Sequence, residues 1–174
     1  MAYQITDTRI GLPYITSITS IATTTLNIGQ FPVGTLVKAK DPTYGEGEFI
    51  LLAGVANLTV GQMVTYNPLS GLTVLTPNTA NLAQPIAVAM AANTSATALS
   101  WFQIEGAAVI KKTATKVGVN VAMFQSATTG RIMATIATGK QILGARSIPA
   151  ATVASATSTV TVLINRPHIQ GQII

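Results

Sequence analysis

Apolar and polar residues alternate along most of this chain, in short runs that turn signals separate. In the run over 34–40, for example, Val37 and Ala39 alternate with Lys38 and Lys40. A period of two is typical of a β-strand with one buried face, and the abundant Thr, Val and Ile favour the same backbone. No segment carries the apolar stripe of a long amphipathic helix. The only helical candidates, 78–84 and 150–156, span one or two turns each.

The pattern predicts nine or ten short strands, joined by connections too short for parallel crossovers. The expected strands cover 34–40, 48–55, 62–66, 72–75, 85–91, 100–112, 117–125, 131–135, 141–147 and 158–165. We expect a bulge at Gly106 in the longest strand, and we expect Arg166-Pro167 to end the last one, because proline donates no ladder hydrogen bond. Strands at this spacing predict an all-β fold, a compact antiparallel barrel or sandwich.

The first 32 residues differ from the rest. They are rich in Thr and Ile, they are interrupted by Pro13 and Pro32, and regular alternation starts only at Gly34. We interpret 1–32 as an extended N-terminal arm and 33–174 as a single β-barrel-like domain. The alternative for the arm is an ordinary edge strand.

Two stretches of the domain resemble one another. Each has an aromatic strand that ends in glycine, a Val-Gly strand, a turn that ends in glycine and a further apolar strand. The first runs from Phe49 to the strand after Gln84, and the second from Trp101 to the strand after Gln141. Internal duplication and the ordinary regularity of a β-meander explain this equally well.

Composition narrows the classes of protein further. Hydrophobic residues are 48% and charged residues 9% of the chain, which excludes intrinsic disorder. The longest apolar runs, 49–56 and 85–92, are far shorter than the roughly 18 residues of a membrane span. Asp7 and Arg9 interrupt the first residues, so we expect no secretory leader. A surface with so few charges suggests that part of it is buried in an assembly.

The residues of common active sites are scarce. The chain has no Cys, one His and five carboxylates, and it has no Gly-x-Ser-x-Gly motif. Acid–base or nucleophilic catalysis needs positioned pairs of titratable groups. We therefore predict that the protein is not an enzyme, with no catalytic residue, cofactor, metal or small-molecule substrate.

The net charge is +5, but the ten basic residues are thinly spread and aromatic residues are only 5%. This argues against nucleic acid, whose binding uses basic stripes and stacking aromatics, and favours an acidic protein partner. Of the neighbours Trp101 and Phe102, alternation predicts one in the core and the other as an interface anchor.

Candidate partner-contact residues follow from location and chemistry. They are Tyr3, Arg9 and Tyr14 in the arm, with Arg166 and His168 after the last expected strand. An extended arm can add to the edge of a partner's sheet. For each residue, an ordinary solvent-facing side chain is an equally good interpretation.

The chain from Gly34 to Arg166 resembles the head-decoration, or cement, proteins of tailed bacteriophages. The resemblance rests on the segments Gly34 to Lys38, Val60 to Tyr66, Gly71 to Val74, Pro85 to Ala89, Ser100 to Ile110 and Thr159 to Asn165. It implies a virion protein on the outer surface of the capsid, made in the cytoplasm of a bacterial host. It also implies a homotrimer that clamps the major capsid protein, with no membrane or nucleic-acid partner. The alternatives are another virion subunit, such as a tail-tube or tail-adaptor protein, and a carbohydrate-binding β module.

Overall fold

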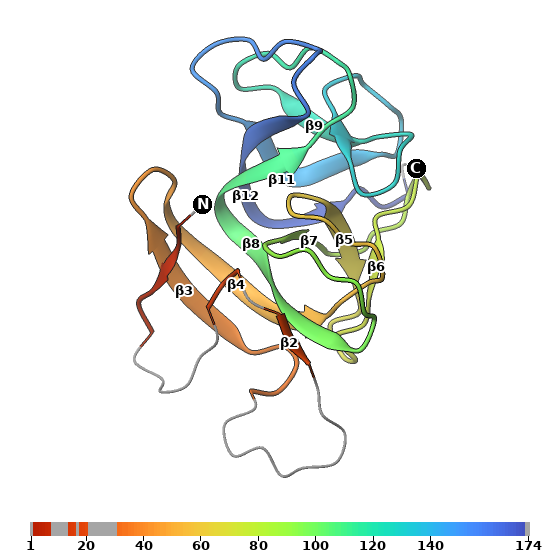
Figure 1. The fold of residues 1–174 in the computed structure, drawn as a ribbon. Helices are drawn as coiled ribbons and strands as arrows, with labels where there is room; N and C mark the ends of the chain where they lie inside the picture. The colour runs from red at the N-terminus through yellow and green to blue at the C-terminus, as the bar shows by residue number, and fades with distance from the viewer. Residues whose placement is uncertain (1, 8–13, 17, 21–30, 173–174) are drawn as a thin grey trace.

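The computed structural model describes residues 2–7, 14–16, 18–20 and 31–172 (Figure 1). These residues form strands and turns, and none of them forms a helix long and apolar enough to cross a membrane. The strands are β1 (Gln4–Ile5), β2 (Ile18–Ser20), β3 (Leu36–Asp41), β4 (Gly45–Ala53), β5 (Met63–Tyr66), β6 (Thr73–Leu75), β7 (Ile86–Ala89), β8 (Ala98–Lys111), β9 (Ala122–Gln125), β10 (Ile132–Met133), β11 (Gln141–Ser147) and β12 (Thr159–Ile169).

The predicted all-β antiparallel class is confirmed. All paired strands are antiparallel, and β3 to β12 supply the ten strands expected after residue 32. The main path runs β1-β3-β4-β8-β12-β11-β9-β10, and β2 and β7 join it as branches on β8. The sheet folds onto itself as a sandwich and does not close into a barrel.

Three details of the prediction are wrong. The segments 78–84 and 150–156 contain no helix, and they form loops and turns instead. The last strand does not end at Arg166-Pro167, because β12 continues to Ile169. Its pairing with β11 shifts between Leu143 and Ala145, so Pro167 lies in an irregularity where no ladder hydrogen bond is needed.

Two of the described parts of residues 1–32 contribute strands to the sheet. The strand β1 pairs with β3, and β2 pairs with the first residues of β8. Tyr3 and Ile15 are buried in the same cluster as residues of β3, β4 and β8. These parts of the segment therefore behave as the ordinary edge strands of the alternative interpretation.

Strand pairing repeats along the chain, which supports the internal duplication. In the first unit, β5 pairs with β6 and β7, β7 pairs with β8, and β4 pairs with β8. In the second unit, β9 pairs with β10 and β11, β11 pairs with β12, and β8 pairs with β12. The units β4–β7 and β8–β11 thus have the same topology, and each is closed by the strand that follows it.

The hairpins of the two units match in detail. Their first strands are both four residues long and begin 59 positions apart, at Met63 and Ala122. The backbone hydrogen bond Asn67 to Leu72 recurs as Ser126 to Arg131, each at 3.0 Å. Each turn ends in a glycine of positive φ, Gly71 at 66° and Gly130 at 70°. Only a residue without a side chain adopts this conformation readily, which explains why glycine is repeated there.

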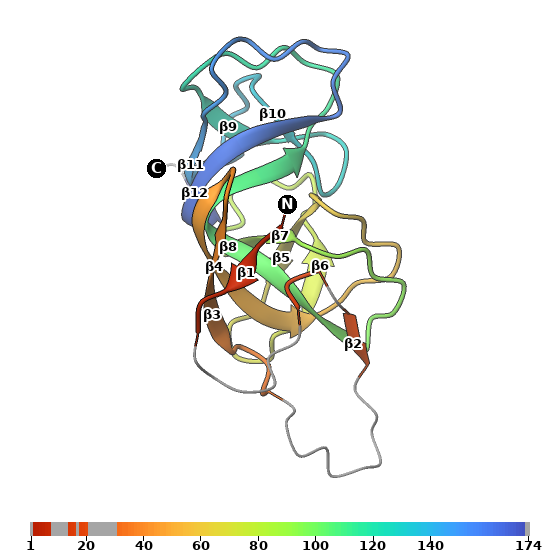
Figure 2. The same ribbon diagram turned by 60° about the vertical axis from the view of Figure 1, so that its left-hand side comes forward.

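The 14-residue strand β8 connects the two units (Figure 2). Its pairing with β4 shifts between Glu48 and Phe49, and the extra residue on β8 is Ile104 rather than Gly106. Gly106 itself has a φ of 98°, and a Cβ there would lie 2.3 Å from the carbonyl oxygen of Glu46. The strand therefore changes direction over 104–106, and glycine lets β4 approach it closely.

Both faces of the first half of β8 are covered, which corrects the expectation for Trp101 and Phe102. Trp101 lies in a cluster with Tyr3 and residues of β3 and β4, and Phe102 in a cluster with residues of β4, β5 and β7. Both side chains are fully buried. The alternation is correct, but neither face is left for a partner.

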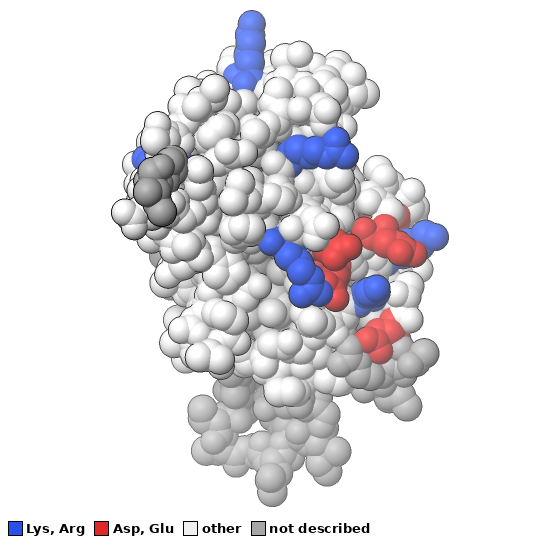
Figure 3. Space-filling model, turned by 180° about the vertical axis from the view of Figure 1, so that it is seen from behind, with Lys and Arg blue, Asp and Glu red and all other residues white. Residues whose placement is uncertain are grey.

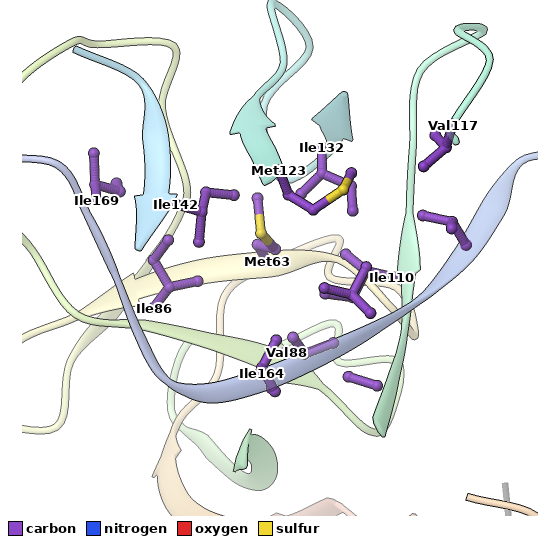
Figure 4. Close-up of a cluster of buried hydrophobic side chains, with 13 residues drawn as sticks. Met63, Ile86, Val88, Ile110, Val117, Met123, Ile132, Ile142, Ile164 and Ile169 are labelled. Atoms are coloured by element: carbon purple, nitrogen blue, oxygen red, sulfur yellow. The ribbon is translucent and has the colours of Figure 1, made fainter. Parts of the chain in front are cut away.

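A third cluster joins the two units. Met63, Ile86 and Val88 of the first unit meet Ile110, Met123 and Ile142, among others, of the second unit. These side chains converge from several strands on one centre (Figure 4). The cavity among them is about 10 Å³, too small for a ligand. It is a packed core that makes the stability of each unit depend on the other.

Candidate functional site

Tyr3, a predicted contact residue, is a core residue. Its hydroxyl donates to the carbonyl oxygen of Ala107 at 3.0 Å, and Gln103 donates to that hydroxyl at 3.3 Å. Its ring packs edge-to-face on Phe49, with the centroids 4.8 Å apart. Burial raises the pKa of the Tyr3 phenol to about 12. The side chain anchors the N-terminal segment to β8 and offers no surface to a partner.

Three of the other four predicted contact residues, Tyr14, Arg166 and His168, are described by the structure. Arg9 lies outside the described residues. Tyr14 exposes 82% of its surface, although the next residue, Ile15, is buried. Arg166 and His168 lie on β12, where His168 is opposite Leu143. Among the described contact residues, Tyr3 is thus buried, whereas Tyr14 and Arg166 are largely exposed.

Arg166 makes a specific contact within the chain. Its guanidinium donates to a carboxylate oxygen of Glu48 at 2.5 Å, across from β12 to β4. The Arg166 side chain is largely exposed, whereas Glu48 is mostly covered. Arg166 therefore forms an ion pair that bridges the two units, while most of its side chain stays exposed to solvent.

Charged side chains gather on the outer face of β3, β4 and β8. Lys38 is opposite Glu48, which is in turn opposite Glu105, and Lys40 is opposite Glu46. Figure 3 shows this group of acidic atoms with basic atoms around it, on a face that is otherwise mostly uncharged. The depression among these side chains is only about 50 Å³. Among the described residues, no group of three or more His, Asp or Glu could hold a metal ion.

Asp41 is buried at the end of β3 and organises the local backbone. Its carboxylate accepts hydrogen bonds from the N–H groups of Ala2, Thr43 and Tyr44. Burial opposes ionisation, but these hydrogen bonds outweigh it and hold the pKa of the Asp41 carboxyl below its usual value. Its role is structural, because the oxygens face the turn.

Lys112 is a buried cation that sequence reasoning did not identify. Its ammonium donates to the carbonyl oxygens of Thr115 at 2.9 Å and Ala154 at 3.0 Å, and less closely to those of Thr113 and Ser155. Burial lowers the pKa of the Lys112 ammonium. The side chain joins the loop after β8 to the loop before β12. No signal in the sequence indicates this, because the acceptors are backbone carbonyls, and two of the four lie 42 and 43 residues away.

Large apolar side chains are exposed on the β5–β6 hairpin, which sequence reasoning also did not single out. Leu69 exposes 97% of its surface, Leu72 63% and Val74 56%. They lie at the turn and along β6, and β5 is the one described strand with which β6 pairs. Leu69 could have been predicted, since it occupies the tip of an Asn-Pro-Leu-Ser-Gly turn, where no buried face exists.

The matching hairpin of the second unit is different. At the spacing of 59 residues, Thr128, Arg131 and Met133 stand where the first hairpin has Leu69, Leu72 and Val74. The β9–β10 hairpin folds in the same way with a polar residue, Thr128 or Arg131, in place of each leucine. The exposed leucines are therefore not required by the fold of the hairpin.

Comparison with known proteins finds no matching family model, no matching curated protein and no matching solved structure. The resemblance to phage decoration proteins thus stays a prediction, and the function must be argued from the surfaces described above.

Proposed function

We propose that this protein is a structural virion component that decorates and stabilises the exterior of a phage capsid by binding the major capsid protein as a homotrimer. The observation that carries the proposal is the exposed apolar surface of the β5–β6 hairpin. Large exposed apolar groups on a rigid fold favour permanent association, because interfaces between obligate subunits are the most hydrophobic.

We assign this hairpin surface to contacts between copies of the chain. Leu69, Leu72 and Val74 carry no charge and lie on one short edge strand with its turn. An apolar patch of this kind suits an interface that forms once and stays buried. The low charged content of the chain supports the same conclusion, since a monomer of this composition would have poor solubility.

The chemistry of the polar groups supports a structural role over catalysis. Asp41 is saturated by backbone N–H groups, Glu48 is paired with Arg166, and Lys112 is enclosed by carbonyl oxygens. Each of these titratable groups stabilises the fold. A structural protein that holds a shell together needs such internal anchors and a large area of contact.

The test combines solution mass with binding to shells. Light scattering after gel filtration is expected to give the mass of three chains, and the protein is expected to co-sediment with expanded shells of the phage that encodes it. A double variant that carries the residues of the second hairpin, Leu69→Thr with Leu72→Arg, is expected to be a folded monomer that binds shells at least tenfold more weakly, because avidity is lost.

The control is Ile136→Thr, which removes another exposed apolar side chain, outside the β5–β6 hairpin. It is expected to leave the trimer intact. A wild-type monomer that does not bind shells would contradict the proposal. A ring of more than three copies, or a tube, would favour the tail-subunit alternative.

A further inference from the structure

The charges of the chain are divided unequally between its two halves. Residues 106–174 contain seven Lys and Arg and no Asp or Glu, whereas residues 1–105 contain three Lys and Arg and all five carboxylates. The formal charge is therefore +7 in the second half and −2 in the first, for the total of +5. We call the described residues 106–172 the basic half; they comprise the end of β8 with β9 to β12.

The division in sequence is also a division in space. The strands of the basic half form one end of the molecule, and β3 to β7 form the other (Figure 2). In Figure 3 the acidic atoms in view form one group, and the basic atoms above it have no acidic neighbours in view. The molecule thus presents one end whose side-chain charges are all positive.

Three partly or fully exposed cations of the basic half bind neutral oxygens, whereas Arg166 is paired with the carboxylate of Glu48. Lys140 donates to the side-chain oxygen of Asn78 at 2.6 Å, and Arg146 to that of Asn120 at 2.6 Å. Lys111 donates to the hydroxyl of Thr59 at 2.7 Å. Such contacts fix the direction of a side chain without neutralising it. The basic half therefore keeps a positive field, which attracts acidic surfaces.

The cations are also held on a rigid support. Arg146 lies on β11, between β9 and β12, and Arg166 lies on β12. Lys116 is exposed in the loop that the Lys112 ammonium ties to the segment 154–155. Fixed positions of this kind lower the entropic cost of matching charges on a partner.

The composition of this end favours an acidic protein over a nucleic acid. Residues 106–174 contain one Phe, Tyr or Trp, namely Phe124, and it is buried. Base stacking on aromatic side chains is therefore not available there. The exposed loop over 150–158 carries Ala, Thr, Ser and Val, small side chains that suit close contact with another protein.

We infer that the basic half is the surface by which the protein docks on an acidic protein face. This inference rests on the proposed function, under which that face is the outer surface of the capsid shell. The apolar hairpin then joins copies to one another, and the basic half joins them to the shell. Electrostatic docking also predicts fast association and strong salt dependence.

The test compares two double variants of equal charge change. Lys116→Gln with Arg146→Gln neutralises two exposed cations of the basic half, and Lys38→Gln with Lys40→Gln neutralises two exposed lysines of β3. Each changes the formal charge from +5 to +3. Co-sedimentation with shells in about 50 mM NaCl is expected to be about tenfold weaker for the first pair and within about twofold of wild type for the second.

The outcomes separate the two proposals. Failure of the wild-type protein to bind shells contradicts the proposed function. Binding that both pairs weaken equally, or that about 300 mM NaCl leaves unchanged, overturns the basic half as the docking surface and leaves the function standing. A short DNA duplex serves as the probe for nucleic acid, the other class of partner. If the protein binds this duplex more tightly than it binds shells, and only Lys116→Gln/Arg146→Gln weakens DNA binding, the inference of an acidic protein partner is overturned in favour of nucleic acid.

Discussion

The two units of this protein share a pattern of strand pairing but differ in their surfaces. The hairpins β5–β6 and β9–β10 have strands at the same spacing, and their turns end in Gly71 and Gly130. One hairpin exposes leucines, and the other lies in a half with seven basic residues and no acidic ones. The comparison separates residues that the hairpin fold requires from residues that differ between the two surfaces. The turn glycines recur, whereas the exposed leucines of the first hairpin do not.

The largest loss of stability is expected at Gly106, in the strand β8 that connects the two units. Gly106→Ala would place a Cβ 2.3 Å from the carbonyl oxygen of Glu46, at a φ of 98°. We expect a loss of about 3 kcal/mol or more, from backbone strain together with displacement of β4. Urea unfolding followed by Trp101 fluorescence measures it.

The control for this variant is Gly45→Ala. Gly45 has a φ of 75° but nothing within 4 Å of the added Cβ, so we expect only the conformational cost of about 1 kcal/mol. Equal losses for the two glycines would show that the close approach of β4 to β8 does not matter. Two separate unfolding transitions in the wild type would show that the units fold independently despite their shared core.

The second largest loss of stability is expected when the buried Lys112 of the second unit is replaced. Lys112→Met would remove the ammonium from four carbonyl oxygens, and we expect a loss of about 2 kcal/mol. The neighbouring Lys111→Met, which removes one exposed hydrogen bond, should cost no more than about 0.5 kcal/mol.

The pH dependence of the Lys112 variant provides a separate check. Because burial lowers the pKa of Lys112 below 10.5 in the folded state, the unfolded chain holds this proton more tightly. The contribution of Lys112 to stability is thus greatest above pH 10.5 and declines as the pH falls through the folded pKa. The difference in free energy of unfolding between wild type and Lys112→Met, measured with urea, should therefore become smaller as the pH falls over this range.

The third effect concerns the anchor of the N-terminal segment. Tyr3→Phe would remove the hydrogen bonds to Ala107 and Gln103, at a cost of about 1 kcal/mol at neutral pH. The pKa of Tyr3 is about 12 in the folded state against 10.0 for a free tyrosine. The neutral phenol therefore stabilises the fold fully below pH 10, and this contribution is lost as the pH rises from 10 to 12. Thermal unfolding across that range should show a smaller loss in Tyr3→Phe than in wild type.

The smallest effect is expected at the ion pair that bridges the units. Arg166→Ala should cost about 0.5 kcal/mol at low salt, because the arginine is largely exposed and screened by solvent. A double-mutant cycle with Glu48→Gln would isolate the pair. A coupling energy above about 1 kcal/mol would show that this ion pair contributes substantially to holding the two units together.

Much of the fold could be predicted from alternation and turn residues. The strand Gln141–Ser147 was predicted with its observed bounds, and both predicted hairpins form. Local sequence specifies these features, because side-chain period and turn glycines act within a few residues.

What could not be predicted depends on long-range packing. The burial of both Trp101 and Phe102 requires layers on each side of β8, and β12 passes Pro167 because β11 shifts register there. The candidate site was predicted less well. Tyr3 is a core anchor, and Lys112 is defined by backbone carbonyls that only the folded chain assembles. Leucines in a turn and a long stretch without acids are visible in the sequence, and the surfaces proposed above rest on them.

The pairing of β2 with β8 has a consequence for the order of events during synthesis. Ile18 is opposite Ser100, and the Tyr3 hydroxyl donates to Ala107. Neither contact can form until β8 has been synthesised, about 80 to 100 residues later. Contacts so distant in sequence form slowly, because a long loop must close before they stabilise the chain. We expect the N-terminal strands to dock late in folding, after the two units have met across their shared core.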